Sequence, residues 1–184
     1  RAALLEGEAD IAVHSFKDLP TGRPLGLAIG AVPARADPRD ALVARDGLTL
    51  HDLPQEASVG TGSPRRAAQL LAVRPDLTIV DIRGNVDTRL GRVKGLGRYA
   101  KNGGKEDLDA VVLAASGLAR LGHSGAVTEF LDPSVVLPAP AQGALAVECR
   151  TADSRHGKLA KALARIDDRR TRLAATAERA VLSH

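Results

Sequence analysis

The 184-residue sequence has few aromatic side chains and a single cysteine. It contains no tryptophan or methionine, and its aromatic residues are Phe16, Tyr99 and Phe130, so we expect an aliphatic core. One cysteine excludes an internal disulfide and favours a protein of the reducing cytoplasm. No stretch approaches the roughly 18 consecutive apolar residues of a transmembrane helix, and no close pair of histidines indicates a metal site. We therefore expect neither a membrane partner nor a metal.

The sequence also lacks a large excess of either charge, because its formal net charge is +4 at pH 7. The basic residues are unevenly divided, with 20 arginines and 6 lysines. Codon usage and a solvated surface account for most arginines, but planar guanidinium groups also bind carboxylates and phosphates through paired hydrogen bonds. A nucleic-acid partner is not favoured, because binding of single strands relies on stacking aromatic side chains.

The order of the elements predicts an α/β fold. Short apolar runs that alternate with helical patterns are typical of a mostly parallel sheet. The predicted strands cover residues 10–14 (expected to be buried), 25–29, 41–44, 58–61, 77–82, 109–114 and 145–149. The predicted helices cover residues 64–73, 86–94, 116–121 and much of the chain from 154 onward. Residues 95–107 are rich in glycine and charge and predict an exposed, mobile loop.

Three polar segments lie where predicted strands end. In open α/β sheets, ligands bind at the carboxyl ends of strands and at the N-termini of the helices that follow. The first segment is His14–Asp18, the second is Thr61–Arg66 with Ser63 as a helix cap, and the third is Arg83–Asn85, followed by Arg89. Such a set of hydroxyls, helix N-termini and arginines suits a ligand with several negative charges. Each segment is equally compatible with an ordinary surface turn, so both interpretations stay open at this point.

A series of motifs resembles the porphobilinogen deaminase (hydroxymethylbilane synthase) family. In chain order the motifs are "GEADIAVHSFKDLP", "DPRDALV", "VGTGSPRRAAQL", "RPDLTIVDIRGNVDTRL", "DAVVLAASGLARLG", "LPAPAQGALAVECR" and "ATAERA". The resemblance implies a transferase of tetrapyrrole and heme biosynthesis, which condenses four porphobilinogen molecules into hydroxymethylbilane and releases ammonia. It also implies a two-lobed architecture like that of periplasmic binding proteins, with the active site between the lobes, a third α+β domain and a covalent dipyrromethane cofactor.

The resemblance assigns roles to individual residues. Asp18 matches the catalytic aspartate of the family, and one carboxylate can protonate the departing amine, face the pyrrole cation and accept the proton lost afterwards. The growing product accumulates acetate and propionate groups, which an arginine-rich site suits. The residues that the resemblance assigns to substrate or cofactor binding are Ser15, Lys17, Thr61, Ser63, Arg65, Arg66, Arg83, Gly84, Arg89, Arg120 and Gln142.

The resemblance further predicts a fragment of a longer, three-domain protein. Residues 1–32 with about 140–163 should belong to the first domain, 37–137 to the second, and 166–184 to the start of the third. The family's cofactor cysteine follows the "ATAERA" motif and is absent here, as is the family's N-terminal part, and Cys149 matches no attachment site. We therefore expect this chain to be inactive alone and its parent to be a cytoplasmic monomer. The alternative is a two-lobed, non-catalytic binding module for a small polyanion.

Overall fold

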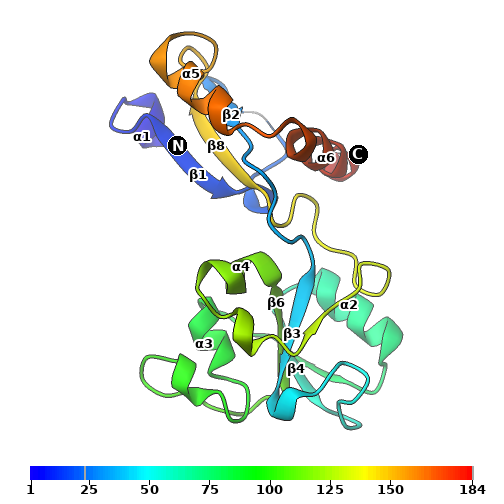
Figure 1. Ribbon diagram of the computed structural model, residues 1–184. Coiled ribbons are helices and arrows are strands. Elements are labelled where there is room, and N and C mark those ends of the chain that lie inside the picture. Colours follow the sequence, from blue (N-terminus) through cyan, green and yellow to red (C-terminus); the bar gives the residue numbers. More distant parts are fainter. Residues whose placement is uncertain (23, 184) are drawn as a thin grey trace. The chain divides into compact units, whose positions relative to one another are not determined.

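The computed structural model describes residues 1–22 and 24–183, which form two compact units. Unit 1 comprises Arg1–Pro38 and Ala139–His184, and unit 2 comprises Arg39–Pro138. The chain therefore begins in unit 1, builds the whole of unit 2 and then returns to unit 1 (Figure 1).

Unit 1 is built on a three-stranded antiparallel sheet. Its central strand is β8, and the strands on either side are β1 and β2. The strand bounds are β1 (Ile11–Ser15), β2 (Leu27–Ala31) and β8 (Leu145–Arg150). The helices are α1 (Ala2–Leu5), α5 (Gly157–Ile166) and α6 (Arg169–Ala180), with short 3-10 helices η1 (Phe16–Asp18) and η5 (Val181–Ser183).

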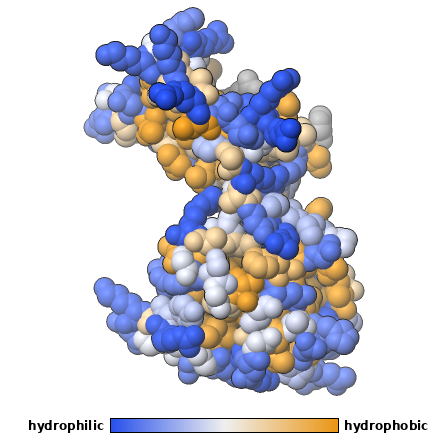
Figure 2. Space-filling view, in the orientation of Figure 1, coloured by the Kyte–Doolittle hydropathy of each residue, from blue (hydrophilic) through white to orange (hydrophobic). Residues whose placement is uncertain are grey.

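Strand β1 is more exposed than its apolar sequence predicts. Ile11 is 43% exposed and Val13 is 58% exposed, so the prediction of a buried strand is wrong although the strand itself is confirmed. The reason is that Ile11 and Val13 alternate along this edge strand and so lie on one face of the sheet, which is open to solvent there. Hydrophobic residues accordingly reach the surface of unit 1 among the charged ones (Figure 2).

Unit 2 contains a five-stranded mixed sheet in the order β5-β4-β6-β3-β7. The strand bounds are β3 (Asp40–Ala44), β4 (Ser58–Gly60), β5 (Thr78–Val80), β6 (Ala110–Ala114) and β7 (Glu129–Phe130). The helices are α2 (Pro64–Val73), α3 (Val86–Leu90) and α4 (Ala115–Arg120), with 3-10 helices η2 (Arg45–Gly47), η3 (Gly97–Tyr99) and η4 (Ser124–Ala126).

The prediction of mostly parallel sheet is wrong. Strand β4 pairs in parallel with β5 and β6, because α2 and α3 lie in the connections that bring the chain back to the same end of the sheet. Strand β3 instead pairs antiparallel with β6 and β7, and every strand pair of unit 1 is antiparallel. Antiparallel strands can pair without a helical crossover between them. The alternation of strands and helices in the sequence therefore did not reveal the direction of these pairs.

The central strands of unit 2 are buried on both faces. Leu42 of β3 packs with Leu70 of α2 on one face of the sheet, whereas Val43 packs with Leu90 of α3 and Leu118 of α4 on the other. Sheets covered on both faces have continuous apolar strands, which explains the runs "ALVA" and "AVVLA". The helices on either side thus hold the strand ends of unit 2 in fixed positions.

The start of one helix agrees with the sequence analysis, and one loop is better held than expected. Helix α2 has the predicted bounds, and the Ser63 hydroxyl accepts a 3.5 Å hydrogen bond from the Arg66 amide. Within residues 95–107, the Gly97 amide donates to the Glu106 carboxylate at 2.7 Å. A Cβ at Gly104 would fall 1.6 Å from the carbonyl oxygen of Gly91, so only glycine fits this contact. The loop is therefore packed against the chain after α3, and its mobility stays a prediction.

Within the described residues, no helix combines the length and the apolar character needed to cross a membrane.

Candidate functional site

Lys17 and Asp18 lie in η1, directly after strand β1. Ser15, the last residue of β1, pairs with Leu145 of β8, and the Phe16 amide then donates to the carbonyl oxygen of Ala144 at 3.0 Å. This bond turns the chain away from the sheet at the point where the two charged residues follow. Lys17 is half-buried, whereas Asp18 is exposed, so the adjacent side chains have different surroundings.

Lys17 contacts Gln142, another of the predicted site residues. Its Nζ atom donates to Oε1 of Gln142 at 3.2 Å. Gln142 is fully buried, and its Nε2 atom donates to the carbonyl oxygen of Pro38 at 2.7 Å. Its main-chain carbonyl accepts from Nε of Arg35 at 2.8 Å. The amide of Gln142 is therefore fixed with its oxygen toward the Lys17 ammonium.

Asp18 has an open carboxylate. Across the described residues, 1–22 and 24–183, this side chain has no hydrogen bond or ion pair with another part of the chain. Surface carboxylates next to basic residues gain little from pairing, and here the neighbouring Lys17 turns to Gln142 instead. The Asp18 carboxylate is thus accessible to a ligand or to a proton from solvent.

In unit 2 the predicted residues gather at one edge of the sheet. Strands β5, β4 and β6 are parallel, so their carboxyl ends lie at the same edge. Thr61 directly follows β4, and its hydroxyl accepts from the Ser63 amide at 3.2 Å. Arg83 and Gly84 follow β5, and helix α4 begins directly after β6. This edge is the one where ligands bind in open α/β sheets.

Arg65 and Arg66 hold the same internal carboxylate. Nη2 of Arg65 lies 2.7 Å from Oδ2 of Asp40, and Nη2 of Arg66 lies 2.7 Å from Oδ1. Arg66 also donates to the carbonyl oxygen of Val112 at 3.1 Å, and Arg65 donates to that of Leu137. The side chain of Arg66 is 8% exposed and that of Arg65 is 26% exposed, above a fully buried Asp40. Arg66 is therefore enclosed, and Arg65 is the member of the pair with access to a ligand.

The turn after β5 has one extended arginine and one arginine that closes the turn. The side chain of Arg83 is 91% exposed, and its Nε atom lies 3.7 Å from the Asp81 carboxylate. Gly84 has a φ of +108°, a conformation that favours glycine. Nε of Arg89 donates to the Gly84 carbonyl oxygen at 2.8 Å and fixes this turn. Arg83 thus extends into solvent from a rigid base.

Arg120 lies at the end of α4 that is opposite the carboxyl end of β6. It is the last residue of α4, which begins at the carboxyl end of β6. A helix of this length places its end about 8 Å from its start, so Arg120 is a helix length away from the strand edge.

The sequence did not predict a role for three residues that hold the site together, although each belongs to one of the motifs quoted above. Asp40 belongs to "DPRDALV", and its signal was a single acid at the start of an otherwise apolar strand. Glu178 and Arg179 belong to "ATAERA". Their contacts are with residues more than 35 positions away, so no local pattern could have revealed them.

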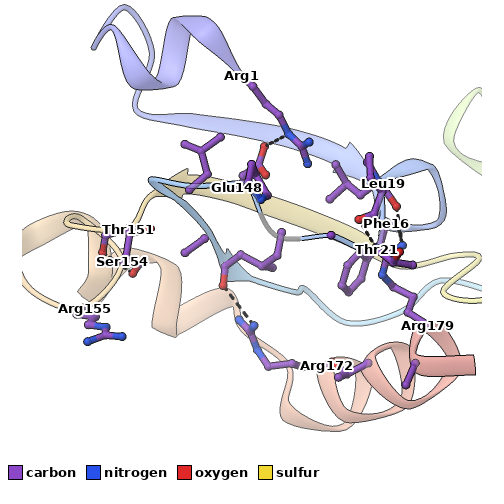
Figure 3. Close-up of a pocket in the computed structure, with 18 residues that line it drawn as sticks. Arg1, Phe16, Leu19, Thr21, Glu148, Thr151, Ser154, Arg155, Arg172 and Arg179 are labelled. Carbon is purple, nitrogen blue, oxygen red and sulfur yellow. Dashed lines mark hydrogen bonds and ion pairs between the residues drawn. The ribbon is translucent and has the colours of Figure 1, made fainter. Parts of the chain in front are cut away.

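Unit 1 also has a pocket of about 540 Å³, but the predicted site residues do not line it. Its wall includes Phe16 and Leu19 from the η1 region, Glu148 from β8, and Arg172 and Arg179 from α6 (Figure 3). Several charged groups of this wall contact other parts of unit 1, as when Nε of Arg1 donates to Glu148 at 3.0 Å. Figure 3 therefore shows the side of η1 that faces α6.

Cys149 occupies the core of unit 1. It is fully buried in β8 and packs with Ala31 and Leu163. A Cβ added at Gly30 would lie 2.9 Å from its Sγ atom, so β2 crosses closely over the sulfur. Burial raises the pKa of the Cys149 thiol, which keeps it protonated and unreactive. This cysteine does not fit a covalent attachment site, whereas the exposed arginines of unit 2 fit a group with carboxylates.

Among the residues that the structure describes, no three histidine, cysteine, aspartate or glutamate side chains group in a way that could hold a metal ion.

The family comparison gives a direct match. The family model described as "Porphobilinogen deaminase, dipyromethane cofactor binding domain" matches residues 1–158. The chain belongs to the porphobilinogen deaminase family. Proteins named porphobilinogen deaminase from Micrococcus luteus, Acidothermus cellulolyticus and Leifsonia xyli are 56%, 59% and 59% identical over 99%, 100% and 100% of this chain. The matched regions are 53% of each relative, so the chain spans about half the length of the curated relatives it matches.

Solved structures of periplasmic binding proteins share the fold. A periplasmic substrate-binding protein of an ABC transporter from Coxiella burnetii matches 96% of this chain and 78% of its own, with a TM-score of 0.55 and 16% identity. A nutrient-binding protein from Burkholderia cenocepacia, solved with methionine bound, matches 87% and 72%, with a TM-score of 0.52 and 16% identity. At such identities the likeness concerns the fold alone. It confirms an α/β, periplasmic-binding-protein-like fold, and the third α+β domain stays a prediction.

Proposed function

We propose that the protein to which this chain belongs condenses four porphobilinogen molecules head to tail into hydroxymethylbilane and releases ammonia at each addition. The observation that carries this proposal is the match of residues 1–158 to the porphobilinogen deaminase family. The identity of 56–59% to proteins of that name points the same way. Under this proposal the protein is a transferase of tetrapyrrole biosynthesis.

We infer that unit 2 binds the carboxylates of the substrate and of the growing product. Each porphobilinogen has an acetate and a propionate group, and guanidinium groups bind carboxylates strongly. Exposure favours Arg83 and Arg65 as direct contacts, whereas Arg66 acts through the carboxylate of Asp40. The remaining proposed contacts in this unit are Thr61, Ser63, Gly84, Arg89 and Arg120.

Asp18 is proposed to move the protons of the reaction. A protonated Asp18 carboxyl gives its proton to the amino group of porphobilinogen, the carbon–nitrogen bond breaks, and ammonia leaves. The carboxylate then faces the positively charged methylene-pyrrole that remains. After the new carbon–carbon bond forms, the same carboxylate takes the proton that the pyrrole ring loses. Its open, exposed position supports this role, because no bond within the chain has to break first.

Ser15, Lys17 and Gln142 are proposed to bind substrate or cofactor next to Asp18. The Lys17 ammonium is oriented by the buried Gln142 amide, so a substrate carboxylate would meet a charge in a set position. When bound, the dipyrromethane cofactor supplies the primer to which porphobilinogen units are added. Because Cys149 is buried in β8, we infer that this chain alone has no thiol to hold the cofactor and makes no hydroxymethylbilane.

Assay of the full-length protein with porphobilinogen tests the proposed function. We expect stoichiometric release of ammonia, formation of hydroxymethylbilane, and an intact mass that includes a dipyrromethane adduct. The Cys149→Ser variant should keep both the adduct and the activity, whereas the 184-residue chain should show neither. A full-length protein that binds the substrate but releases no ammonia would instead support a non-catalytic binding module.

We also propose the domain division as 1–32 with 140–163, 37–137, and 166–184 as the start of a third domain. In the structure, α6 packs on unit 1, with Thr171 and Ala175 buried. Limited proteolysis of the full-length protein would show whether cleavage falls near residues 32–37 and 163–166. A cytoplasmic, monomeric parent stays a prediction.

A further inference from the structure

Two consecutive residues of α6 contact the two segments that carry the proposed reactive groups of unit 1. Arg179 contacts the segment that contains Lys17 and Asp18, and Glu178 contacts the segment that contains Gln142. The sequence motif "ATAERA" holds both residues, and neither has a part in the proposed chemistry.

Arg179 binds main-chain oxygens on both sides of Asp18. Its Nη1 atom donates to the carbonyl oxygen of Phe16 at 2.8 Å and to that of Leu19 at 2.9 Å. Its Nη2 atom donates to the carbonyl oxygen of Pro20 at 2.7 Å. The guanidinium carbon lies 4.7 Å from the centre of the Phe16 ring (Figure 3). One rigid, planar group therefore fixes the backbone immediately before and after the turn that presents Asp18.

Glu178 holds the neighbouring turn. Its two carboxylate oxygens accept from Nη1 and Nη2 of Arg35, at 2.5 and 2.9 Å, and one of them also accepts from the Ala141 amide at 2.7 Å. Ala141 has a φ of +62°, which is costly for a residue other than glycine. Nε of Arg35 in turn donates to the carbonyl oxygen of Gln142, the residue whose side chain orients Lys17.

We propose that Glu178 and Arg179 are positioning residues, which fix Gln142 and hence Lys17 on one side and the Asp18 turn on the other. The inference rests on the proposed function, because it assigns α6 a part in placing the groups that bind and protonate porphobilinogen. Neither residue touches the substrate in this account. Each acts through backbone and side-chain bonds to a residue that does.

Another arginine of α6 provides a matched control. Arg172 also bonds two main-chain oxygens, those of Ile29 at 3.3 Å and Gly30 at 3.2 Å, and it pairs with Asp167 at 2.7 Å. It anchors the same helix to strand β2 instead of to η1. Replacement of either arginine by lysine removes the planar fork from α6 and keeps the positive charge.

The test compares Arg179→Lys with Arg172→Lys in the full-length protein with its cofactor bound. For Arg179→Lys we expect kcat to fall at least about tenfold with KM within about twofold of wild type, because placement of the acid affects the chemical step. Amide hydrogen exchange at Leu19 should speed up at least about tenfold, since its acceptor, the Phe16 carbonyl, loses its anchor. Arg172→Lys should leave kcat, KM and the exchange rate at Leu19 within about twofold of wild type. This holds even if its Tm falls as far as that of Arg179→Lys.

Glu178→Gln tests the contacts that fix Gln142 and Lys17, and it should affect substrate binding. Loss of the charge that holds Arg35 and the Ala141 amide loosens Gln142, so we expect KM to rise at least about fivefold with kcat within about twofold. Equal falls of kcat in Arg179→Lys and Arg172→Lys, or unchanged Leu19 exchange in Arg179→Lys, would overturn the inference. If the wild-type protein makes no hydroxymethylbilane, the proposed function is wrong and the catalytic role of Arg179 falls with it, whereas the exchange measurement still decides whether Arg179 holds the turn.

Discussion

Each unit contains an aspartate of the candidate site, and the two carboxylates have opposite surroundings. In unit 1 an exposed carboxylate, that of Asp18, has no partner within the described chain. In unit 2 a buried carboxylate, that of Asp40, lies beneath Arg65 and Arg66 and binds both. One acid is thus available for proton transfer, and the other fixes the arginines in place. The proposed function thus assigns the open aspartate to proton transfer, whereas the enclosed aspartate orients two arginines.

The Asp40→Asn substitution removes the charge of the buried carboxylate in unit 2, and we expect it to have the largest effect on stability. The change leaves the enclosed Arg66 without its anion, and breaking a buried pair costs about 3–5 kcal/mol. Urea unfolding of the chain should therefore show a lower midpoint at an unchanged m-value. Asp46→Asn is the matched control, because Asp46 pairs with Arg45 at the surface with a side chain that is 67% exposed. A loss below about 1 kcal/mol for Asp40→Asn, the range of surface pairs, would contradict this account.

Asp109 is another enclosed carboxylate of unit 2, and its contribution to the stability of the fold depends on pH. Burial alone would raise the pKa of Asp109, but hydrogen bonds from Lys94, Ser58 and Arg45 outweigh burial and hold the pKa well below its usual range. Because the folded pKa is lower than the unfolded one, this carboxylate stabilises the fold above about pH 4, and the contribution is lost as the pH falls below that value.

The measurement is the difference in unfolding free energy between wild type and Asp109→Asn, taken at pH 7 and at pH 2.5. We expect Asp109→Asn to cost about 2 kcal/mol at pH 7 and less at pH 2.5, where the wild-type carboxylate begins to lose its advantage. A difference that is the same at both pH values would show that the ionised state of Asp109 does not stabilise unit 2.

The Arg83→Gln substitution should have the smallest effect on stability, and it tests whether an exposed arginine contributes to binding alone. Arg83 is exposed and supports no internal carboxylate as Arg66 does, so the unfolding free energy should change by no more than about 0.5 kcal/mol. Loss of one charge-assisted bond to a substrate carboxylate should raise KM about tenfold with little change in kcat. Arg98→Gln, an exposed arginine of the 95–107 loop, should leave KM unchanged. An unchanged KM for Arg83→Gln in a steady-state assay would remove Arg83 from the site.

Local sequence signals predicted the parts of the fold that depend on neighbouring residues. Ser63 and Pro64 gave the start of α2 because the cap and the first helical residue are adjacent in sequence. The position of Asp18 after β1 was predicted in the same way. The antiparallel partners of β8 were not, because strand direction depends on residues more than 100 positions apart. Burial of β1 failed for a similar reason, since an edge strand has the same apolar sequence as a central one.

For the candidate site as well, local sequence predicted some features, and contacts between distant residues decide the others. Sequence placed Arg65, Arg66 and Arg83 together as carboxylate-binding arginines, and local pattern could not tell the enclosed Arg66 from the extended Arg83. That distinction comes from Asp40, 26 positions before Arg66 in the chain. Likewise, the bonds of Arg179 to the Asp18 turn span about 160 positions. Motif resemblance named the candidate residues, and tertiary contacts show which of them are fixed and by which partners.

Turnover by Asp18→Asn in the full-length protein tests the central claim most directly. Asparagine keeps the shape of Asp18 but cannot give or take a proton, so we predict that ammonia release falls by at least about 100-fold. Substrate binding should stay within about threefold and Tm should not change, because Asp18 is exposed and makes no bond within the described chain. Glu8→Gln, an exposed acid of the same unit, should behave as wild type. Ammonia release by Asp18→Asn at the wild-type rate would contradict the account.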